Sequence, residues 1–363
     1  MTQFTVKKIA LVSTLKRIVS FMPKTSSEAR ESMVKVIASD SKIELVLSQP
    51  SVHMQSGCEA IVADVGTPFV ISGRKLLEIA TTAETDVQFT FDGTRVEVSS
   101  GASKWLVPVF KANIPHKDVD MTPTITFDSY DLITGLNTVK YAAATDSVRP
   151  SLFMVDVEDG RVRACNGYRY HEVNIQEPGL TFQLPGAMID GFISVLRFFD
   201  GDVGFMREGN RFYFQNNLDV FSMTKITAKF PDLDKILVRP LKSQSPALLK
   251  SNRSDLLNAI KKVRVASDED YPYIEMHISK SEVLFRCSQN TGAEAVSSVA
   301  ASWDNKPRIA NFDAVSLQES IKAAWDEDIE MRFGRDTKDR RSPLVIEGDG
   351  AWSMLNQVKV GRL

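Results

Sequence analysis

The sequence has few of the residues that build disulfide frameworks or metal clusters. Its three cysteines, Cys58, Cys165 and Cys287, are far apart and form no CxxC pair. This odd number and wide spacing support neither a disulfide framework nor a zinc cluster, and a reducing cytoplasm fits them best. No run of about 18 apolar residues is present. Because basic residues also interrupt the N-terminal segment, we expect neither a membrane span nor a signal peptide.

Catalytic motifs are also missing. The chain has no Walker-type glycine-lysine loop, no GxSxG, no HExxH and no glycine fingerprint after a strand. The four histidines are scattered, and the three consecutive carboxylates from Asp268 to Asp270 are typical of a solvated loop rather than a cation site. We therefore expect a non-catalytic protein without a metal or cofactor.

The chain instead contains a repeated unit, an amphipathic helix of about four turns followed by hairpin-forming strands, which recurs roughly every 60 residues. Apolar residues recur at i, i+4 and i+7 in six segments, which predicts six helices that each bury one face. These stripes are Leu11/Leu15/Ile18, Leu76/Ala80/Ala83, Leu132/Leu136/Val139, Ile189/Ile193/Leu196, Leu256/Ile260/Val263 and Leu317/Ile321/Ala324.

The segments between the helices alternate apolar and polar residues around tight-turn signals. This pattern is clearest at 87–97, 153–164 and 203–214, and it predicts locally joined antiparallel strands. The sequence therefore predicts an α+β protein.

Pairing the six units two by two divides the chain into three similar domains. Polar, proline-containing stretches at 116–124 and 239–248 are typical of short connectors. The predicted domains are 1–121, 122–246 and 247–363, each with two helices and two antiparallel sheets. The helical segments carry a net positive charge although the whole chain has a net charge of −2, which is a moderate indication of nucleic-acid binding.

Several segments resemble the bacterial β sliding clamp, the processivity subunit of DNA polymerase III. The segment at 145–170, TDSVRPSLFMVDVEDGRVRACNGYRY, resembles the signature of the family's middle domain, where the usual motif is close to TDGHRL. Further matches lie at 72–79, 100–110, 229–237, 252–267 and the terminal Arg362-Leu363, so the resemblance spans the chain in the family's order.

The resemblance implies a DNA-clamp fold and a head-to-tail homodimer that closes into a ring around duplex DNA without reading its sequence. Such a ring tethers the replicative polymerase, and its partners include the clamp loader and other proteins with clamp-binding motifs. It would act in the cytoplasm at the nucleoid. The helices would line the hole, where a loose basic lining attracts phosphates nonspecifically. The positions expected to face DNA are Lys8, Lys16, Arg17, Lys24, Arg149, Lys261 and Lys262.

In this family, client proteins insert a short apolar peptide between the second and third domains. The positions carried over to this groove are Cys165, Gly167, Tyr168, Arg169, Tyr170, Pro231, Lys235, Ile236, Tyr271, Pro343, Val360, Arg362 and Leu363. Tyr168 and Tyr170 replace a usual His and Leu, and the tail from Lys359 to Leu363 departs from the usual Met-Pro-Met-Arg-Leu. These departures predict a different client motif, and ordinary packing between domains is the alternative role for these residues.

The resemblance also implies an interface between the first domain of one subunit and the third domain of the other. The positions expected there are Lys75, Ile79, Trp105, Val107, Val265 and Ala266.

Three other functions are alternatives to that of a clamp. A sequence-preferring DNA-binding factor would need base-reading Arg, Asn or Gln on a recognition helix, whereas these helices carry mainly lysine and apolar residues. An enzyme or small-molecule binder would need a convergent cluster of His, Cys or acidic residues. A non-ring DNA-binding or scaffold protein built on the same repeated module stays open.

Overall fold

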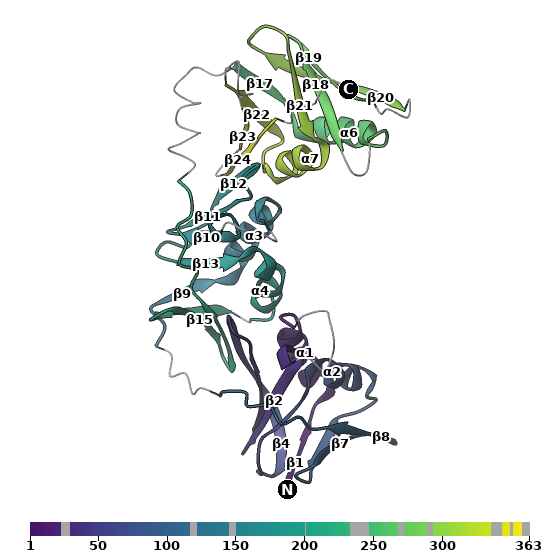
Figure 1. The fold of residues 1–363 in the computed structure, drawn as a ribbon, viewed down its shortest axis with the longest axis vertical. Helices are drawn as coiled ribbons and strands as arrows, with labels where there is room; N and C mark the ends of the chain where they lie inside the picture. Colours follow the sequence, from purple (N-terminus) through teal and green to yellow (C-terminus); the bar gives the residue numbers. More distant parts are fainter. Residues whose placement is uncertain are drawn as a thin grey trace. The chain divides into compact units, whose positions relative to one another are not determined.

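A computed structural model describes residues 1–22, 30–116, 122–144, 150–199, 201–232, 247–267, 272–288, 293–334, 343–348 and 351–357. Within these residues the chain is an α+β protein, and its two large sheets are antiparallel throughout. All six predicted helices are present, namely α1 (Lys8–Val19), α2 (Gly73–Thr82), α3 (Ser129–Val139), α4 (Ile189–Leu196), α6 (Arg253–Arg264) and α7 (Ala314–Ala323) (Figure 1). The predicted fold class is confirmed.

The helices are shorter than predicted, but their apolar faces are as expected. They span 8 to 12 residues, whereas four turns need about 14. The side chains of Ser72, Asn252 and Asp313 accept a hydrogen bond from a backbone N–H in the first turn of α2, α6 and α7, respectively. Such caps satisfy N–H groups that have no partner within the helix, and they set where these helices begin.

The first sheet belongs to one compact unit, formed by Met1–Ile133 and Met188–Lys225. Its strands in spatial order are β8 (Ser103–Pro108), β7 (Arg95–Ser100), β6 (Val87–Phe91), β1 (Thr2–Val6), β4 (Val52–Asp64), β16 (Asp219–Thr224), β15 (Arg211–Asn216), β14 (Asp202–Glu208) and β9 (Ile125–Asp128). Off this path, β3 (Lys42–Ser48) pairs with β4, and β2 (Met33–Ser39) pairs with β3 and β5 (Phe69–Ser72).

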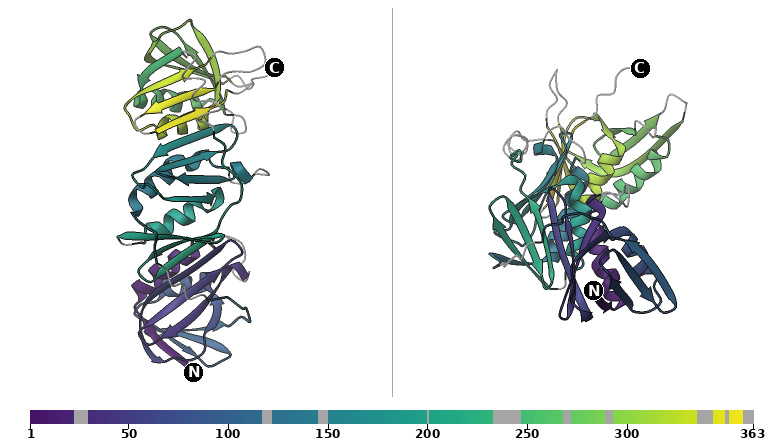
Figure 2. Two further views of the ribbon diagram at one scale, coloured as in Figure 1. Left: turned by 90° about the vertical axis from the view of Figure 1, so that its left-hand side faces the viewer. Right: turned by 60° about the horizontal axis from the view of Figure 1, so that its bottom comes forward.

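The second sheet belongs to the other unit, formed by Thr134–Ala187 and Ile226–Leu363. Its order is β13 (Thr181–Pro185), β10 (Met154–Glu158), β11 (Arg161–Cys165), β12 (Arg169–Asn174), β24 (Ala351–Leu355), β23 (Leu344–Gly348), β22 (Asp328–Phe333), β17 (Ala247–Asn252), β20 (Glu294–Trp303), β19 (Glu282–Ser288), β18 (Tyr273–Ile278) and β21 (Arg308–Asp313). Figure 2 shows both sheets from two further directions.

The order of helices and strands along the chain repeats three times. From β1 to β8, from β9 to β16 and from β17 to β24, the described elements follow one pattern: strand, helix, four strands, helix, three strands. We call these runs the first, second and third modules. Helices α1 and α2 contact each other, as do α6 and α7, and α1 and α6 pack on β4 and β20, the corresponding strands of their modules. The predicted repeat of helices and hairpins is therefore present.

The two compact units do not coincide with three modules, because strands of the second module belong to both sheets. In unit 1, β16 pairs antiparallel with β4 of the first module, with Val220 opposite Gln55. In unit 2, β12 pairs antiparallel with β24 of the third module, with Tyr170 opposite Met354. The predicted domain boundaries near 121 and 246 lie outside the described residues, so they stay predictions.

A buried ion network supports the first of these junctions. Arg17 on α1 is 9% exposed, and its Nε donates a hydrogen bond to Ser56 Oγ on β4 at 3.0 Å. The same nitrogen lies 3.3 Å from a carboxylate oxygen of Asp219 on β16, and Ser56 also donates to this carboxylate. Burial raises the pKa of Asp219, while the Arg17 charge opposes this shift. The network thus connects a helix and a strand of the first module to a strand of the second.

Replacing Arg17 with Met should lower the free energy of unfolding by about 3–5 kcal/mol, because Asp219 would keep a buried charge without its partner. The double variant Arg17→Met/Asp219→Leu should recover much of this loss, since it removes both charges. Denaturant unfolding checks this, with Lys16→Gln as the exposed control, expected within about 0.5 kcal/mol of wild type. If Arg17→Met unfolds at the same denaturant concentration as Lys16→Gln, the network does not stabilise the junction.

Candidate functional site

Three of the seven basic positions expected to face DNA are exposed on helices. Lys16 projects from α1, and Lys261 and Lys262 project from the last turn of α6. Arg264 is exposed beside them and donates to Gln318 Oε1 at 2.8 Å. Cations in the last turn also interact favourably with the helix dipole, so a structural reason for them exists as well.

Two other basic side chains form hydrogen bonds within unit 1. Lys8 is half-buried, and its Nζ donates to the carbonyl of Ala83 at the C-terminal end of α2 at 2.5 Å. Arg17 is buried in the network with Ser56 and Asp219. The expectation that Arg17 faces DNA is wrong, because its charge is paired within the protein. Lys24 and Arg149 lie outside the described residues.

Tyr170 and Cys165, expected in the client groove, are packed in the junction between β12 and β24. The Tyr170 side chain is 1% exposed, its ring centroid lies 4.5 Å from that of Trp352, and its hydroxyl donates to Glu172 at 2.6 Å. Burial and the Glu172 carboxylate raise the pKa of Tyr170. Cys165 is 4% exposed in the same apolar cluster. These two residues therefore follow the packing alternative and do not form an open groove wall.

Arg169 is also engaged within unit 2. Its Nη1 lies 2.6 Å from Glu319 and donates to Ser316 Oγ at 3.3 Å, both on α7, and its guanidinium lies 5.3 Å from the Tyr141 ring centroid. The side chain thus joins β12 to α7.

The remaining described positions of the expected groove are accessible. Tyr168 is 76% exposed, and Pro231 and Pro343 are half-buried. Gly167 adopts φ 91°, a left-handed conformation that glycine accepts without strain, and its N–H bonds Cys165 Sγ. The other groove positions, Lys235, Ile236, Tyr271, Val360, Arg362 and Leu363, lie outside the described residues.

The expected dimer interface is only partly accessible. Val107 and Ile79 are 3% and 4% exposed, so both belong to the core of their own module, and their assignment to the interface is wrong. Trp105 and Ala266 are half-buried, Lys75 is exposed and bonded to Glu78, and Val265 is 87% exposed.

Two exposed apolar residues, which lie on strands β8 and β20, are not identified in the sequence analysis. Leu106 on β8 is 61% exposed and Val296 on β20 is 53% exposed. Strand alternation could have found Leu106, because Trp105 and Val107 share one face of β8 and Leu106 lies on the other.

A second buried polar contact lies at the junction between β12 and β24. His171 Nδ1 lies 2.9 Å from the Tyr141 hydroxyl, which donates to Ser320 Oγ on α7. Burial lowers the pKa of His171 to about 3 and raises that of Tyr141 to about 12. Both groups are therefore neutral at physiological pH.

Within the described part of the chain, no helix is long and apolar enough to cross a membrane. In the same part, no group of three or more His, Cys, Asp or Glu residues could hold a metal ion.

The threefold repeat of helices and strands corresponds to the DNA-clamp fold. Solved structures similar to this chain are bacterial DNA polymerase III β sliding clamps. The Caulobacter crescentus sliding clamp matches with a TM-score of 0.88 at 18% identity, and the Bartonella birtlesii clamp bound to griselimycin with 0.87 at 16%. The Thermotoga maritima β subunit matches with 0.83 at 17%. Each match covers 99% of this chain and 100% of the other.

No protein-family model matches the chain, and no curated protein matches its sequence. The resemblance to sliding clamps is therefore confirmed at the level of the fold, over the whole length of the chain.

The buried His171 should make the protein less stable as the pH falls. Its pKa is about 3 when folded against 6.5 in the unfolded chain, so only the unfolded state takes up this proton between those values. Below pH 6.5 this residue should cost about 1.4 kcal/mol of unfolding free energy per pH unit. Unfolding experiments from pH 7 to 4 should give a shallower slope for His171→Gln than for wild type. Parallel slopes would contradict a neutral buried imidazole.

Proposed function

We propose that this protein is a DNA sliding clamp, a non-catalytic ring that encircles duplex DNA and tethers the replicative DNA polymerase. The observation that carries the proposal is the repeat of one strand junction along the chain. β4, β12 and β20 occupy the same place in their modules, as do β8, β16 and β24. Two junctions, between β4 and β16 and between β12 and β24, are formed within the chain.

The third pair of equivalent strands, β8 and β20, is left with open edges. Among the described residues, β8 pairs only with β7, and residues 294–300 of β20 pair only with β19. An open edge presents unpaired N–H and C=O groups that favour pairing with another strand. If β8 of one copy pairs with β20 of another, the two copies form a head-to-tail dimer. The dimer closes into a ring when this pairing is made at both ends.

The register of the second junction suggests which residues meet in the third. Tyr170 lies opposite the fifth residue of β11, and Val296 lies opposite the fifth residue of β19. Met354 and Leu106 are the fourth residues of β24 and β8. Because Tyr170 is opposite Met354, the same register places Leu106 of one copy opposite Val296 of the other. Two exposed apolar side chains would then cover each other, with Val265 at the end of α6 as a further apolar contact.

Exposed basic residues on the helices support nonspecific DNA binding by the proposed ring. Lys16, Lys261 and Lys262 are exposed, and exposed lysine charges suit attraction to phosphates and sliding rather than base reading. A sequence-preferring factor is less well supported, because it would need a recognition helix with base-reading side chains.

The clients of the ring would include the replicative polymerase, the clamp loader and other proteins with clamp-binding peptides, acting in the cytoplasm at the nucleoid. Exposed Tyr168 with Pro231 and Pro343 supports a groove for such peptides near the junction between β12 and β24. Because a short peptide must be ordered on binding, we expect micromolar affinity, increased by tethering to the ring.

The dimer is tested by replacing Leu106 with Arg, which should weaken self-association at least tenfold, about 1.4 kcal/mol, because a charge would enter the apolar contact. Sedimentation across a dilution series measures this. Ile61→Arg is the matched control, since Ile61 is 78% exposed on β4 of the same module, and it should leave the mass unchanged.

Cysteine cross-linking tests the partner strand. The variant Leu106→Cys/Val296→Cys should form covalent dimers on oxidation, while the pair Leu106→Cys/Ile309→Cys should not. Ile309 is also exposed on an edge strand, β21, and the three native cysteines are buried. Equal trapping of both pairs would reject β20 as the partner of β8.

DNA binding is tested by the triple variant of Lys16, Lys261 and Lys262 to Gln. Each lost phosphate contact should reduce the slope of log affinity against log salt by about 0.9 on a short duplex. Lys306→Gln, an exposed lysine in a strand connection, is the control and should leave the slope unchanged.

The ring itself is tested by retention on DNA. Loaded protein should stay on nicked circular DNA in high salt and leave when the circle is linearised, because a closed ring is held by linkage. Release from the circle at the same salt as from linear DNA would favour the non-ring DNA-binding alternative.

A further inference from the structure

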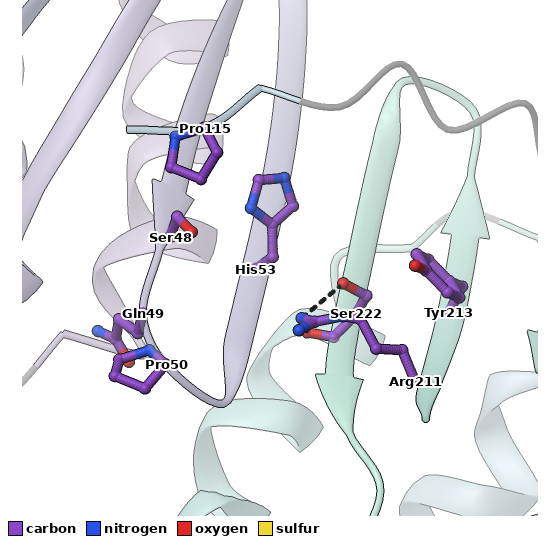
Figure 3. A pocket seen from close by; sticks show the side chains of 8 residues that line it. All are labelled: Ser48, Gln49, Pro50, His53, Pro115, Arg211, Tyr213 and Ser222. Atoms are coloured by element: carbon purple, nitrogen blue, oxygen red, sulfur yellow. Dashed lines mark hydrogen bonds between the residues drawn. The ribbon is translucent and has the colours of Figure 1, made fainter. Parts of the chain in front are cut away.

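A pocket of about 230 Å³ lies at the junction between β4 and β16 in unit 1 (Figure 3). Its lining combines buried polar side chains with two prolines. The lining residues are Ser48, Gln49, Pro50, His53, Pro115, Arg211, Tyr213 and Ser222.

The pocket opens on the face of the sheet opposite α1. Ser56 and Asp219 face α1, because both contact Arg17. His53 and Ser222 each lie three residues away from them along β4 and β16, and an odd separation along a strand places side chains on opposite faces. His53 is directly opposite Ser222 in the strand register, as Figure 3 shows from close by. The pocket is therefore separate from α1 and its exposed Lys16.

Arg211 gives the pocket its charge. Its Nη1 donates to Thr224 Oγ1 at 3.3 Å, and its Nη2 donates to the hydroxyl and carbonyl of Ser222 at 3.1 and 3.4 Å. These contacts fix the guanidinium but involve only neutral acceptors, and they do not use the Nε–H among its five donors. Within the described residues, no carboxylate lies within ion-pair distance of Arg211. A fixed guanidinium without a counter-charge favours an anion.

The other pocket residues add polar groups and limit the size of the ligand. His53, Tyr213 and Ser222 are 7%, 5% and 1% exposed, so they are held by the surrounding sheet. The cavity is below the range of about 300–1,000 Å³ typical of drug-sized ligands. It therefore has room for one or two side chains rather than a nucleotide, and Pro50 and Pro115 offer apolar surface to the neighbouring chain.

We propose that this pocket binds an extended acidic peptide of a partner protein, with a Glu or Asp carboxylate of the peptide paired to Arg211. The equivalent positions of the second junction differ in chemistry. The hairpin of β15 and β16 corresponds to that of β23 and β24. Counted from the turn of each hairpin, Pro343 is equivalent to Arg211, and Met354 is equivalent to Ser222. The first junction thus selects a charged segment where the second packs apolar side chains, so one chain offers two different peptide sites.

Histidine-selective NMR of the full-length protein tests the proposal, because the chain has only four histidines. N-acetyl-Ala-Glu-Ala-amide should shift the His53 signal with a dissociation constant of about 1 mM, as expected for one charged contact in a short peptide. The Gln analogue and inorganic phosphate should each bind at least about tenfold more weakly. Arg211→Gln should lose the response to the Glu peptide, while the exposed control Arg207→Gln should keep it.

Four results would overturn the proposal. The first is that the Glu peptide does not shift the His53 signal at concentrations up to about 10 mM. The second and third are that the Gln peptide, or inorganic phosphate, binds as tightly as the Glu peptide. The fourth is that the Arg211 and Arg207 variants lose the response to the Glu peptide equally. The comparison of Glu with Gln on wild-type protein needs no substitution. It therefore decides the question even if Arg211→Gln does not fold, which the other three histidine signals would report.

Discussion

Antiparallel strand pairing between modules is the constraint on which the rest of the structure depends. Each module ends in a hairpin whose last strand, β8, β16 or β24, has one edge to cover. An uncovered edge attracts other chains, so a repeat protein needs a defined partner for it. Here β16 is covered by β4 and β24 by β12. This pairing extends each sheet beyond one module and explains why the chain divides into two compact units.

The two junctions use different chemistry on the same backbone arrangement. At the first, Arg17, Ser56 and Asp219 form a buried ion network. At the second, Tyr170 packs with Trp352 in an apolar cluster, and the buried polar contact of His171 with Tyr141 is between neutral groups. A buried ion pair is sensitive to the loss of either partner, whereas apolar packing tolerates substitutions of similar volume. The side chains that contact β16 at the first junction therefore differ from those that contact β24 at the second.

The helices and local hairpins of this fold can be predicted from the sequence, because patterns of neighbouring residues encode them. All six helices follow from apolar stripes, and hairpins such as β6 with β7 follow from alternation around a turn. The contacts of individual side chains on these elements depend on distant parts of the chain. The sequence does not show that Arg17 is buried, because its partner Asp219 is about 200 residues away. It does not show that Tyr170 is covered either, because Trp352, which packs on it, belongs to another module.

The sequence by itself determined the α+β class, the threefold repeat and the absence of common catalytic motifs, because these depend on residues close together in the chain. Only the tertiary structure decided that Arg17 and Asp219 form one buried network, and that Arg211, His53 and Ser222 line one pocket. Those assignments depend on which strands pair and in which register. Pairing between distant strands is set by the burial of whole sheet faces, and no local pattern records it.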